Sequence, residues 1–278
     1  MQWRCRDRIL DLTRPLVMGI LNVTPDSFSD GGRYASTDAA LARAIRMVDE
    51  GAAIVDVGGE STRPGAAPIP EATELERVVP VIEGLVAVSK VAISIDTSKP
   101  KVMAAAVAAG ACIVNDIRAL QLPRARSTAA QLQVGVCLMH MQGEPRTMQE
   151  GPYYTDVVGE VGSFLERERG ACIEAGIAPE AIALDPGLGF GKGFQHNLAL
   201  LKALERFAAL PAPLLVGVSR KSFIGKILGT DVDDRLYGGL GLAALAVAKG
   251  ASVIRTHDVR ATCDAIRTVS AVLKGMES

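Results

Sequence analysis

Short apolar runs, many of them rich in β-branched residues, alternate along the chain with longer helix-like stretches. Eight runs have the length of a strand, at residues 16–21, 53–57, 91–95, 111–114, 134–139, 182–184, 214–218 and 252–254. Helix-like stretches lie between them, for example from 37 or 38 to 50, 100–109 and 155–175, and each is followed by a glycine, a residue that commonly ends a helix. Near-continuous apolar strands that alternate with helices are typical of a parallel sheet covered on its faces.

The number of strand–helix units predicts the fold. Eight units in 278 residues match a (β/α)8 TIM barrel, a fold of the α/β class. A doubly wound open sheet is the alternative, because it has the same alternation of strands and helices. No linker, low-complexity tract or block of charge divides the chain, so residues 1–278 are expected to form a single domain.

Nearly every apolar run ends in a residue capable of chemistry. The first polar residues after the eight runs are Asn22, Asp56, Asp96, Asn115 with Asp116, His140, Asp185, Ser219 to Lys221, and Arg255 to His257. All strands of a parallel barrel end at the same mouth, so these side chains are expected to meet there. Loops are polar in any protein, which explains one or two such residues but not all eight. The strand ends therefore predict an active site.

Composition and charge narrow the function and the location. The chain is 49% hydrophobic and 22% charged, as in an ordinary globular protein, and its net charge of −1 argues against nucleic-acid binding through overall charge. Five cysteines without C-x-x-C spacing favour a reducing cytoplasm. The basic N-terminus and the apolar residues 15–23 imitate a signal peptide, but Asp7 and Asp11 interrupt the pattern, so we expect a buried strand there. The apolar run 236–248 is too short to span a membrane.

The loops after the strands are long and carry specific motifs. In chain order these are MGILNVTPDSFSDGG at 18–32, DVGGESTRPG at 56–65, SIDT at 94–97, NDI at 115–117, MHMQG at 139–143, DPGLGFGK at 185–192, SRKSFIG at 219–225 and RTHDV at 255–259. Together they resemble the dihydropteroate synthase family, the pterin-binding transferases of folate biosynthesis that sulfonamides inhibit. The resemblance implies a (β/α)8 barrel that joins 6-hydroxymethyl-7,8-dihydropterin diphosphate to p-aminobenzoate and releases diphosphate. It also implies a homodimer, which the apolar faces expected to be exposed on the last helices, for example at Leu242, Leu245 and Val269, permit.

A pterin would bind at the ends of the third, fourth and sixth strands. Its 2-amino-4-oxo edge presents N–H donors that carboxylates accept, and an amide can both donate and accept. The resemblance implies a pterin site of Asp96, Asn115, Asp185, Lys221, Met139 and Phe190. In it Asp185 holds the amino end, Lys221 donates to the ring oxygen, and Asp96 faces the other side of the ring. From the residues alone, Asp96 could instead cap the helix that begins at Pro100.

Diphosphate requires cations and donors. Arg255 and His257 are two residues apart, so on an extended chain they point to the same side. The resemblance implies a diphosphate site of Asn22, Thr62, Arg63, Arg255 and His257, with Asn22 binding a Mg²⁺ ion. Hard oxygen ligands suit this ion. The alternative for Arg255 is a salt bridge across the barrel to a carboxylate at another strand end.

The p-aminobenzoate would dock beside the pterin. Ser219 could cap a helix that Arg220 begins, which would leave N–H groups near Ser222 for the benzoate carboxylate. The resemblance implies a site of Phe28, Pro64, Phe190, Lys221 and Ser222, and the catalytic residues Asp96, Lys221, Arg255 and His257. The loops 23–36 and 59–70 are long and are expected to close over the site.

Two departures and two alternatives accompany this interpretation. Arg118-Ala119 stands where many relatives carry small residues including glycine, and Gly239 stands where a serine is expected. A pterin-dependent methyltransferase of the same barrel type would share Asp96, Asn115 and Asp185 but has no need for the motifs at 22–28 and 255–257. A non-catalytic pterin-binding paralogue is expected to have lost Arg63, Lys221 or Arg255, and all three are present.

Overall fold

Each of the eight predicted apolar runs forms a parallel strand. The computed structural model describes residues 1–24, 32–62 and 65–274, with the backbone alone for 32–36 and 274. The strands are β3 (Leu16–Asn22), β4 (Ile54–Gly58), β5 (Ala92–Asp96), β6 (Ile113–Asp116), β7 (Gly135–Met139), β8 (Ile182–Asp185), β9 (Leu215–Gly217) and β10 (Val253–Thr256). Their order in the sheet is β8-β7-β6-β5-β4-β3-β10-β9. A parallel bridge between Leu184 and Leu214 joins the two ends, so the sheet closes into the predicted barrel and not into an open sheet.

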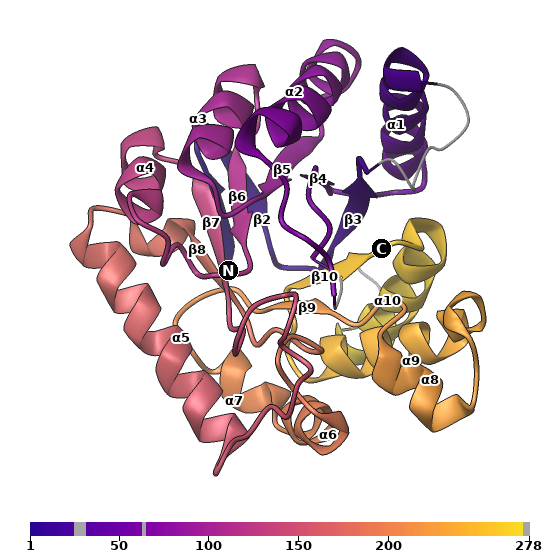
Figure 1. Cartoon of the computed structure of the whole chain (residues 1–278). Coiled ribbons are helices and arrows are strands. Elements are labelled where there is room, and N and C mark those ends of the chain that lie inside the picture. Colours follow the sequence, from indigo (N-terminus) through magenta and orange to yellow (C-terminus); the bar gives the residue numbers. More distant parts are fainter. Residues whose placement is uncertain (25–31, 63–64, 275–278) are drawn as a thin grey trace.

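Helices surround the barrel in a ring (Figure 1). They are α1 (Gly32–Asp49), α2 (Glu71–Val88), α3 (Pro100–Ala109), α4 (Ala125–Leu132), α5 (Val157–Glu174), α6 (Phe194–Lys202), α7 (Leu204–Ala208), α8 (Ser222–Leu228), α9 (Leu236–Ala248) and α10 (Val259–Lys274). The prediction for 100–109 is confirmed, while α1 begins earlier than predicted and α5 is shorter by three residues. Apolar side chains of the helices pack on the outside of the strands and form the main core. Within the described ranges, no helix has both the length and the apolar character that a membrane crossing requires.

An N-terminal hairpin closes the bottom of the barrel. It consists of β1 (Gln2–Cys5) and β2 (Arg8–Asp11), which the apolar pattern did not predict. Trp3 is fully buried, and its indole N–H donates to the carbonyl of Ala181 at 2.9 Å. The ring packs in a second core with residues from the beginnings of the strands, such as Ile54, Ala92 and Val253. The hairpin therefore lies at the end of the barrel opposite the strand ends that carry the polar residues. All five cysteines are buried and free.

Candidate active site

A network of charges crosses the mouth of the barrel. Arg255, in β10, donates from Nε to Asp56 Oδ2 at 2.7 Å and from Nη2 to Asp96 Oδ2 at 2.8 Å. The amide of Asn115 donates to the same Asp56 oxygen at 3.0 Å. Asp56 is fully buried, and its Oδ1 has no hydrogen-bond partner among the described residues. Arg255 therefore forms the salt bridge across the barrel that was one of its two predicted roles, with Asp56 and Asp96 as partners.

Burial sets the protonation of this network. Burial raises the pKa of Asp96 to about 7, against the opposing effect of Arg255 and with a further rise from Asp56. For Arg255, burial lowers the pKa, but the carboxylates of Asp56 and Asp96 more than offset it and leave the pKa above its ordinary value. Arg255 is thus a permanent cation, whereas Asp96 can change its charge near neutral pH. Asp96 does not cap α3, because the N-cap position is held by Lys99.

A second group of predicted residues lies at the ends of β7, β8 and β9. Asp185 is paired in register with Met139 of β7, and its Oδ1 accepts a hydrogen bond of 2.7 Å from the N–H of Gly187. The ammonium nitrogen of Lys221 lies 4.4 Å from the centre of the Phe190 ring, a cation–π contact. Burial lowers the pKa of Lys221 to about 8, although Asp185 acts in the opposite direction. Burial raises the pKa of Asp185.

The glycine-rich segment 185–193 passes close along the end of β7. A Cβ atom on Gly187 would collide with the carbonyl oxygen of His140, so only glycine allows this approach. Lys192 is buried, and its Nζ donates to the carbonyls of His140 at 3.1 Å and Phe190 at 2.9 Å. The His140 Nδ1 atom lies 2.9 Å from the same nitrogen. The segment therefore folds back and presents Phe190 beneath Lys221.

His257 is held by the loop that follows β9. The Ser219 hydroxyl oxygen accepts a hydrogen bond of 3.2 Å from the N–H of His257 and lies 3.0 Å from its Nδ1. The Ser219 hydroxyl can donate to Nδ1 or accept from it, according to the tautomer of the ring, and in either case the contact leaves Nε2 available to a ligand. Burial, together with Arg255, lowers the pKa of His257 to about 3, so the ring is neutral at pH 7.

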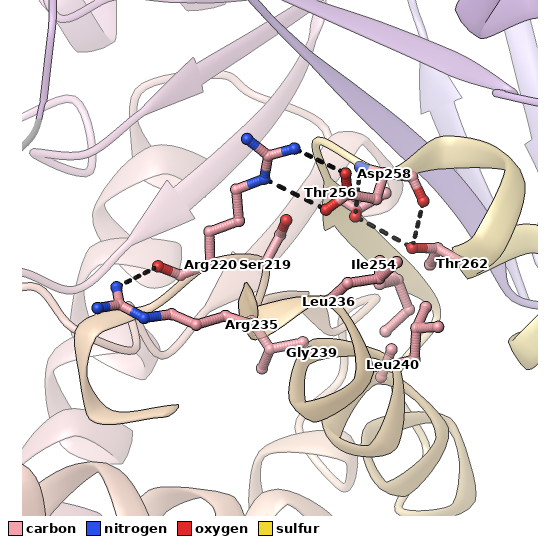
Figure 2. A pocket seen from close by; sticks show the side chains of 12 residues that line it. Ser219, Arg220, Arg235, Leu236, Gly239, Leu240, Ile254, Thr256, Asp258 and Thr262 are labelled. Atoms are coloured by element: carbon pink, nitrogen blue, oxygen red, sulfur yellow. Dashed lines mark hydrogen bonds and ion pairs between the residues drawn. The ribbon is translucent and has the colours of Figure 1, made fainter. Parts of the chain in front are cut away.

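The expected helix cap at Ser219 is wrong. Helix α8 begins at Ser222 and not at Arg220, and Ser219 binds His257 in place of a helix terminus. Figure 2 shows the pocket beside this loop, where Arg220 forms an ion pair of 2.8 Å with Asp258 and Arg235 donates to the Arg220 carbonyl at 3.2 Å. These contacts fix the loop that carries Lys221, although they differ from the predicted ones.

Some predicted residues cannot be placed with the rest. Phe28, Arg63 and Pro64 lie outside the described residues. Asn22 is at the end of β3, and its Oδ1 lies 3.8 Å from the point where Gly58 would carry a Cβ. The Asp96 Oδ2 atom is at the same distance from that point, on the other side. Asn22 and Asp96 are the register neighbours of Gly58 in β3 and β5, so an amide oxygen and a carboxylate oxygen flank Gly58 at the mouth.

The model of one protein family covers most of the chain. The family described as "Pterin binding enzyme" matches residues 18–257, which include every strand of the barrel except the first two residues of β3. The chain belongs to this family of pterin-binding enzymes. The chain is 51% identical to the dihydropteroate synthase of Escherichia coli strain K12, over 97% of its own length and 95% of that protein. It is 49% identical to that of Haemophilus influenzae over 96% and 97% of the two chains.

Solved structures of pterin-binding enzymes agree with this one over almost the whole chain. A Yersinia pestis dihydropteroate synthase with a sulfonamide drug complex superposes with a TM-score of 0.93 at 48% identity, over 98% and 99% of the two chains. A Xanthomonas albilineans dihydropteroate synthase in complex with 7,8-dihydropteroate has a TM-score of 0.90 at 45% identity, over 99% of both. The predicted family and the predicted barrel are therefore confirmed.

The two departures from the pterin-binding pattern have room in the fold. Asp116 accepts hydrogen bonds from the N–H groups of Arg118 and Leu120, and this turn holds Ala119 at a φ of 51°. A left-handed turn of this kind favours glycine, which explains why the position admits small residues. At Gly239 a Cβ would meet nothing nearer than 3.9 Å, so the backbone there does not require glycine.

Two residues of the mouth were missed as site residues. Asp56 was recognised only as the polar end of a strand, and Lys192 only as part of a motif. The signal for Asp56 was a carboxylate inside the apolar run 53–57. Such a charge is rarely buried without a partner, and a parallel barrel offers that partner across its mouth.

Proposed function

We propose that the chain catalyses the dihydropteroate synthase reaction at the mouth of this barrel. It joins 6-hydroxymethyl-7,8-dihydropterin diphosphate to p-aminobenzoate to give 7,8-dihydropteroate and diphosphate. The observation that carries the proposal is the group of buried Asp96, Asn115 and Asp185 with partly buried Lys221 and Arg255 at the mouth of the barrel. The supporting comparison is the match of nearly full length to dihydropteroate synthases, one of them in complex with 7,8-dihydropteroate.

In this proposal the pterin lies between the two groups of charges. Asp185 and Asn115 bind the amino edge of the ring, and Lys221 donates to its oxygen. Met139 and Phe190 contact the ring, with Phe190 supported by the Lys192 amine. A buried carboxylate can accept two N–H groups of the ligand in a medium where such bonds are strong.

The reaction proceeds by departure of diphosphate before attack by the amine. The electron-rich dihydropterin stabilises the positive charge that develops on its methylene carbon, and ionised Asp96 stabilises it further. The departing diphosphate is bound by Arg255, Thr62, Arg63 and the neutral imidazole of His257, which uses its Nε2 atom. The aryl amine is neutral at pH 7 and forms the new C–N bond with its nitrogen lone pair. The arylammonium that results is strongly acidic and releases its proton to water or to the departing diphosphate, so no strong general base is required. Phe28, Pro64, the Lys221 stem and Ser222 would enclose the benzoate.

The mouth is compatible with a magnesium ion. The amide oxygen of Asn22 is a hard ligand, and the Asp96 carboxylate lies across Gly58 from it. No cluster of three or more histidine, cysteine or acidic side chains suited to a metal occurs in the described ranges, and in this proposal water and diphosphate oxygens would complete the coordination of the ion. When bound, Mg²⁺ would supply positive charge to the diphosphate leaving group.

Location and assembly are part of the same proposal. The five free cysteines suit a reducing cytoplasm. The proposed homodimer would use exposed apolar side chains of the late helices, among them Ile227, Tyr237 and Leu245. Leu242 and Val269 are partly buried against the core, so the prediction that they are exposed is wrong.

The direct test is formation of 7,8-dihydropteroate from the two substrates by the purified protein. We expect product that depends on both substrates, diphosphate release in equal amount, and loss of turnover when Mg²⁺ is chelated. A pterin-dependent methyltransferase would instead give no product from p-aminobenzoate, and a non-catalytic paralogue would bind the pterin without turnover.

A further inference from the structure

Lys99 contacts both ends of the segment that connects β4 to α2. Its ammonium donates to the carboxylate of Glu60, two residues after β4, and to the carbonyl of Ile69 at 2.8 Å, two residues before α2. It donates also to Glu74 Oε2 in the first turn of α2 at 2.6 Å. We call this group, Lys99 with Glu60, Glu74 and the Ile69 carbonyl, the Lys99 clasp.

The clasp uses the full capacity of one ammonium group. An ammonium has three N–H donors, and here each has an acceptor. Glu74 is only 1% exposed, so the clasp carries a buried carboxylate that needs its cation. Burial lowers the pKa of Lys99, but Glu60 and Glu74 more than offset this and leave the pKa above its ordinary value. Lys99 is therefore charged throughout the neutral range and has no donor left for a substrate.

Lys99 is itself fixed to the pterin side of the mouth. It is the N-cap residue of α3, three residues after Asp96. Its N–H donates to Thr97 Oγ1 at 3.2 Å, and the N–H of Thr97 donates to the carbonyl of Asn115 at 3.1 Å. The clasp therefore connects the ends of β5 and β6, which carry Asp96 and Asn115, to the segment 60–69.

We propose that Lys99 is a positioning residue that fixes both ends of the segment 60–69 relative to the pterin-binding strand ends. This inference rests on the proposed function, because Thr62 and the neighbouring residues of that segment are assigned to the diphosphate and the benzoate. Residues 63 and 64 lie outside the described residues, and the clasp involves only the segment's two ends. A third contact, from the N–H of Gly65 to the carbonyl of Pro145 at 3.1 Å, attaches the middle of the segment to the loop after β7.

The physical advantage is a smaller entropic cost at each binding event. A ten-residue segment with free ends would have to be ordered whenever substrates bind. With both ends held, only the interior must be ordered at each binding event. Removal of the clasp is therefore expected to affect the steps that use this segment and to leave the pterin pocket intact.

The test compares Lys99→Met with Lys101→Met. Lys101 is on the same helix, its side chain is 79% exposed and it forms an ion pair with Glu71 at the surface, so it is the matched control. We expect Lys99→Met to raise the KM for p-aminobenzoate and for the pterin diphosphate by about tenfold, because misplaced binding groups weaken productive binding. The affinity for 6-hydroxymethylpterin without diphosphate, measured by calorimetry, stays at the wild-type value. Lys101→Met changes none of these quantities.

A second variant protects the test against a folding defect. Glu60→Ala releases one end of the segment but retains the ion pair of Lys99 with buried Glu74, so the fold remains intact. It is expected to shift the same two KM values in the same direction by a smaller factor. Hydrogen exchange of the backbone amides in 61–68 gives a readout that does not require activity: exchange becomes faster in Lys99→Met and Glu60→Ala and is unchanged in Lys101→Met.

The outcomes separate this inference from the proposed function. Wild-type exchange rates in both clasp variants, or KM values equal to those of Lys101→Met, would overturn the role of Lys99. A loss of bare-pterin affinity as large as the rise in KM would also overturn it, because Lys99 would then support the whole pocket. A wild-type protein without dihydropteroate synthase activity would overturn the proposed function, while the exchange experiment would still decide whether the clasp orders the segment.

Discussion

Single residues at the mouth combine strong charge with incomplete pairing. Arg255 bridges Asp56 and Asp96, yet one oxygen of buried Asp56 remains without a partner among the described residues. A buried carboxylate oxygen without a donor is costly, and such sites persist where a ligand supplies the missing group. Lys221 is a donor whose charge is easily changed, because its pKa of about 8 lies just above neutral pH. Asp56 therefore offers a polar ring an acceptor without a donor, and Lys221 offers it a cation.

The pKa of Lys221 predicts how pterin binding depends on pH. The ring oxygen prefers the ammonium, so binding favours the charged form, and affinity is highest below pH 8 and falls as the pH rises through 8. Above that value, the ratio of wild-type to Lys221→Met affinity for 6-hydroxymethylpterin should fall by up to about tenfold per pH unit. Calorimetry from pH 6.5 to 9.5 measures it, and ionisation of the pterin itself cancels because both proteins share the ligand. A ratio that stays constant would remove Lys221 from the contact with the ring.

At the scale of elements, the sequence pattern predicted the eight repeated strands and missed the single N-terminal hairpin. All eight strands were visible because each is a continuous apolar run, and strand ends such as Asp96 and Asp185 followed directly. The β1–β2 hairpin was missed because its four-residue strands mix charged and apolar side chains. The contacts of Arg255 with Asp56 and of Lys99 with Glu60 depend on how distant segments meet in space. Only the resemblance to a family, and not periodicity, could assign roles to such residues.

The hairpin provides a stability test that is separate from catalysis. Trp3→Ala removes a fully buried ring and its hydrogen bond to Ala181, and is expected to lower the free energy of unfolding by about 3–5 kcal/mol. Trp3→Phe keeps most of the ring and loses the hydrogen bond, at about 1 kcal/mol. Urea denaturation measures both. Because the hairpin is at the opposite end of the barrel, the KM values of the folded variants should equal those of the wild type, and a change in either KM would contradict this separation.

Helix α9 offers a matched pair of glycines. A Cβ on Gly238 would come within 2.5 Å of Ile224 Cγ2, so Gly238→Ala must displace the β-branched Ile224 side chain of α8 and is expected to destabilise the protein. A Cβ on Gly241 would meet nothing within 4 Å, so Gly241→Ala should stabilise the helix by about 0.5–1 kcal/mol. Thermal unfolding compares the two variants. Shifts of the same sign would show that the contact between α8 and α9 does not determine which glycine is needed.

For the whole molecule, the mouth joins substrate sites that come from separate parts of the chain. In the proposed function, the pterin carboxylates and amide lie at strand ends that the barrel holds, whereas diphosphate and benzoate also involve the segments 23–31 and 59–70, which connect β3 to α1 and β4 to α2. Arg255 uses two of its five N–H groups on Asp56 and Asp96, and the others are available to a bound diphosphate. Ligands that share these loops and this cation are therefore expected to influence each other's affinity.

The coupling can be measured as a thermodynamic cycle. If diphosphate with Mg²⁺ orders the loops, p-aminobenzoate should bind at least about tenfold more tightly in their presence, since the ordering cost has then been met by the first ligand. Linkage requires that p-aminobenzoate strengthen diphosphate binding by the same factor. Titration calorimetry of each ligand, with and without the other, determines both factors. Arg255→Lys keeps the charge but loses the planar fork, so it should weaken diphosphate binding and reduce the coupling. Equal affinity for p-aminobenzoate in both conditions would show that the two sites form independently and that the loops are not the element they share.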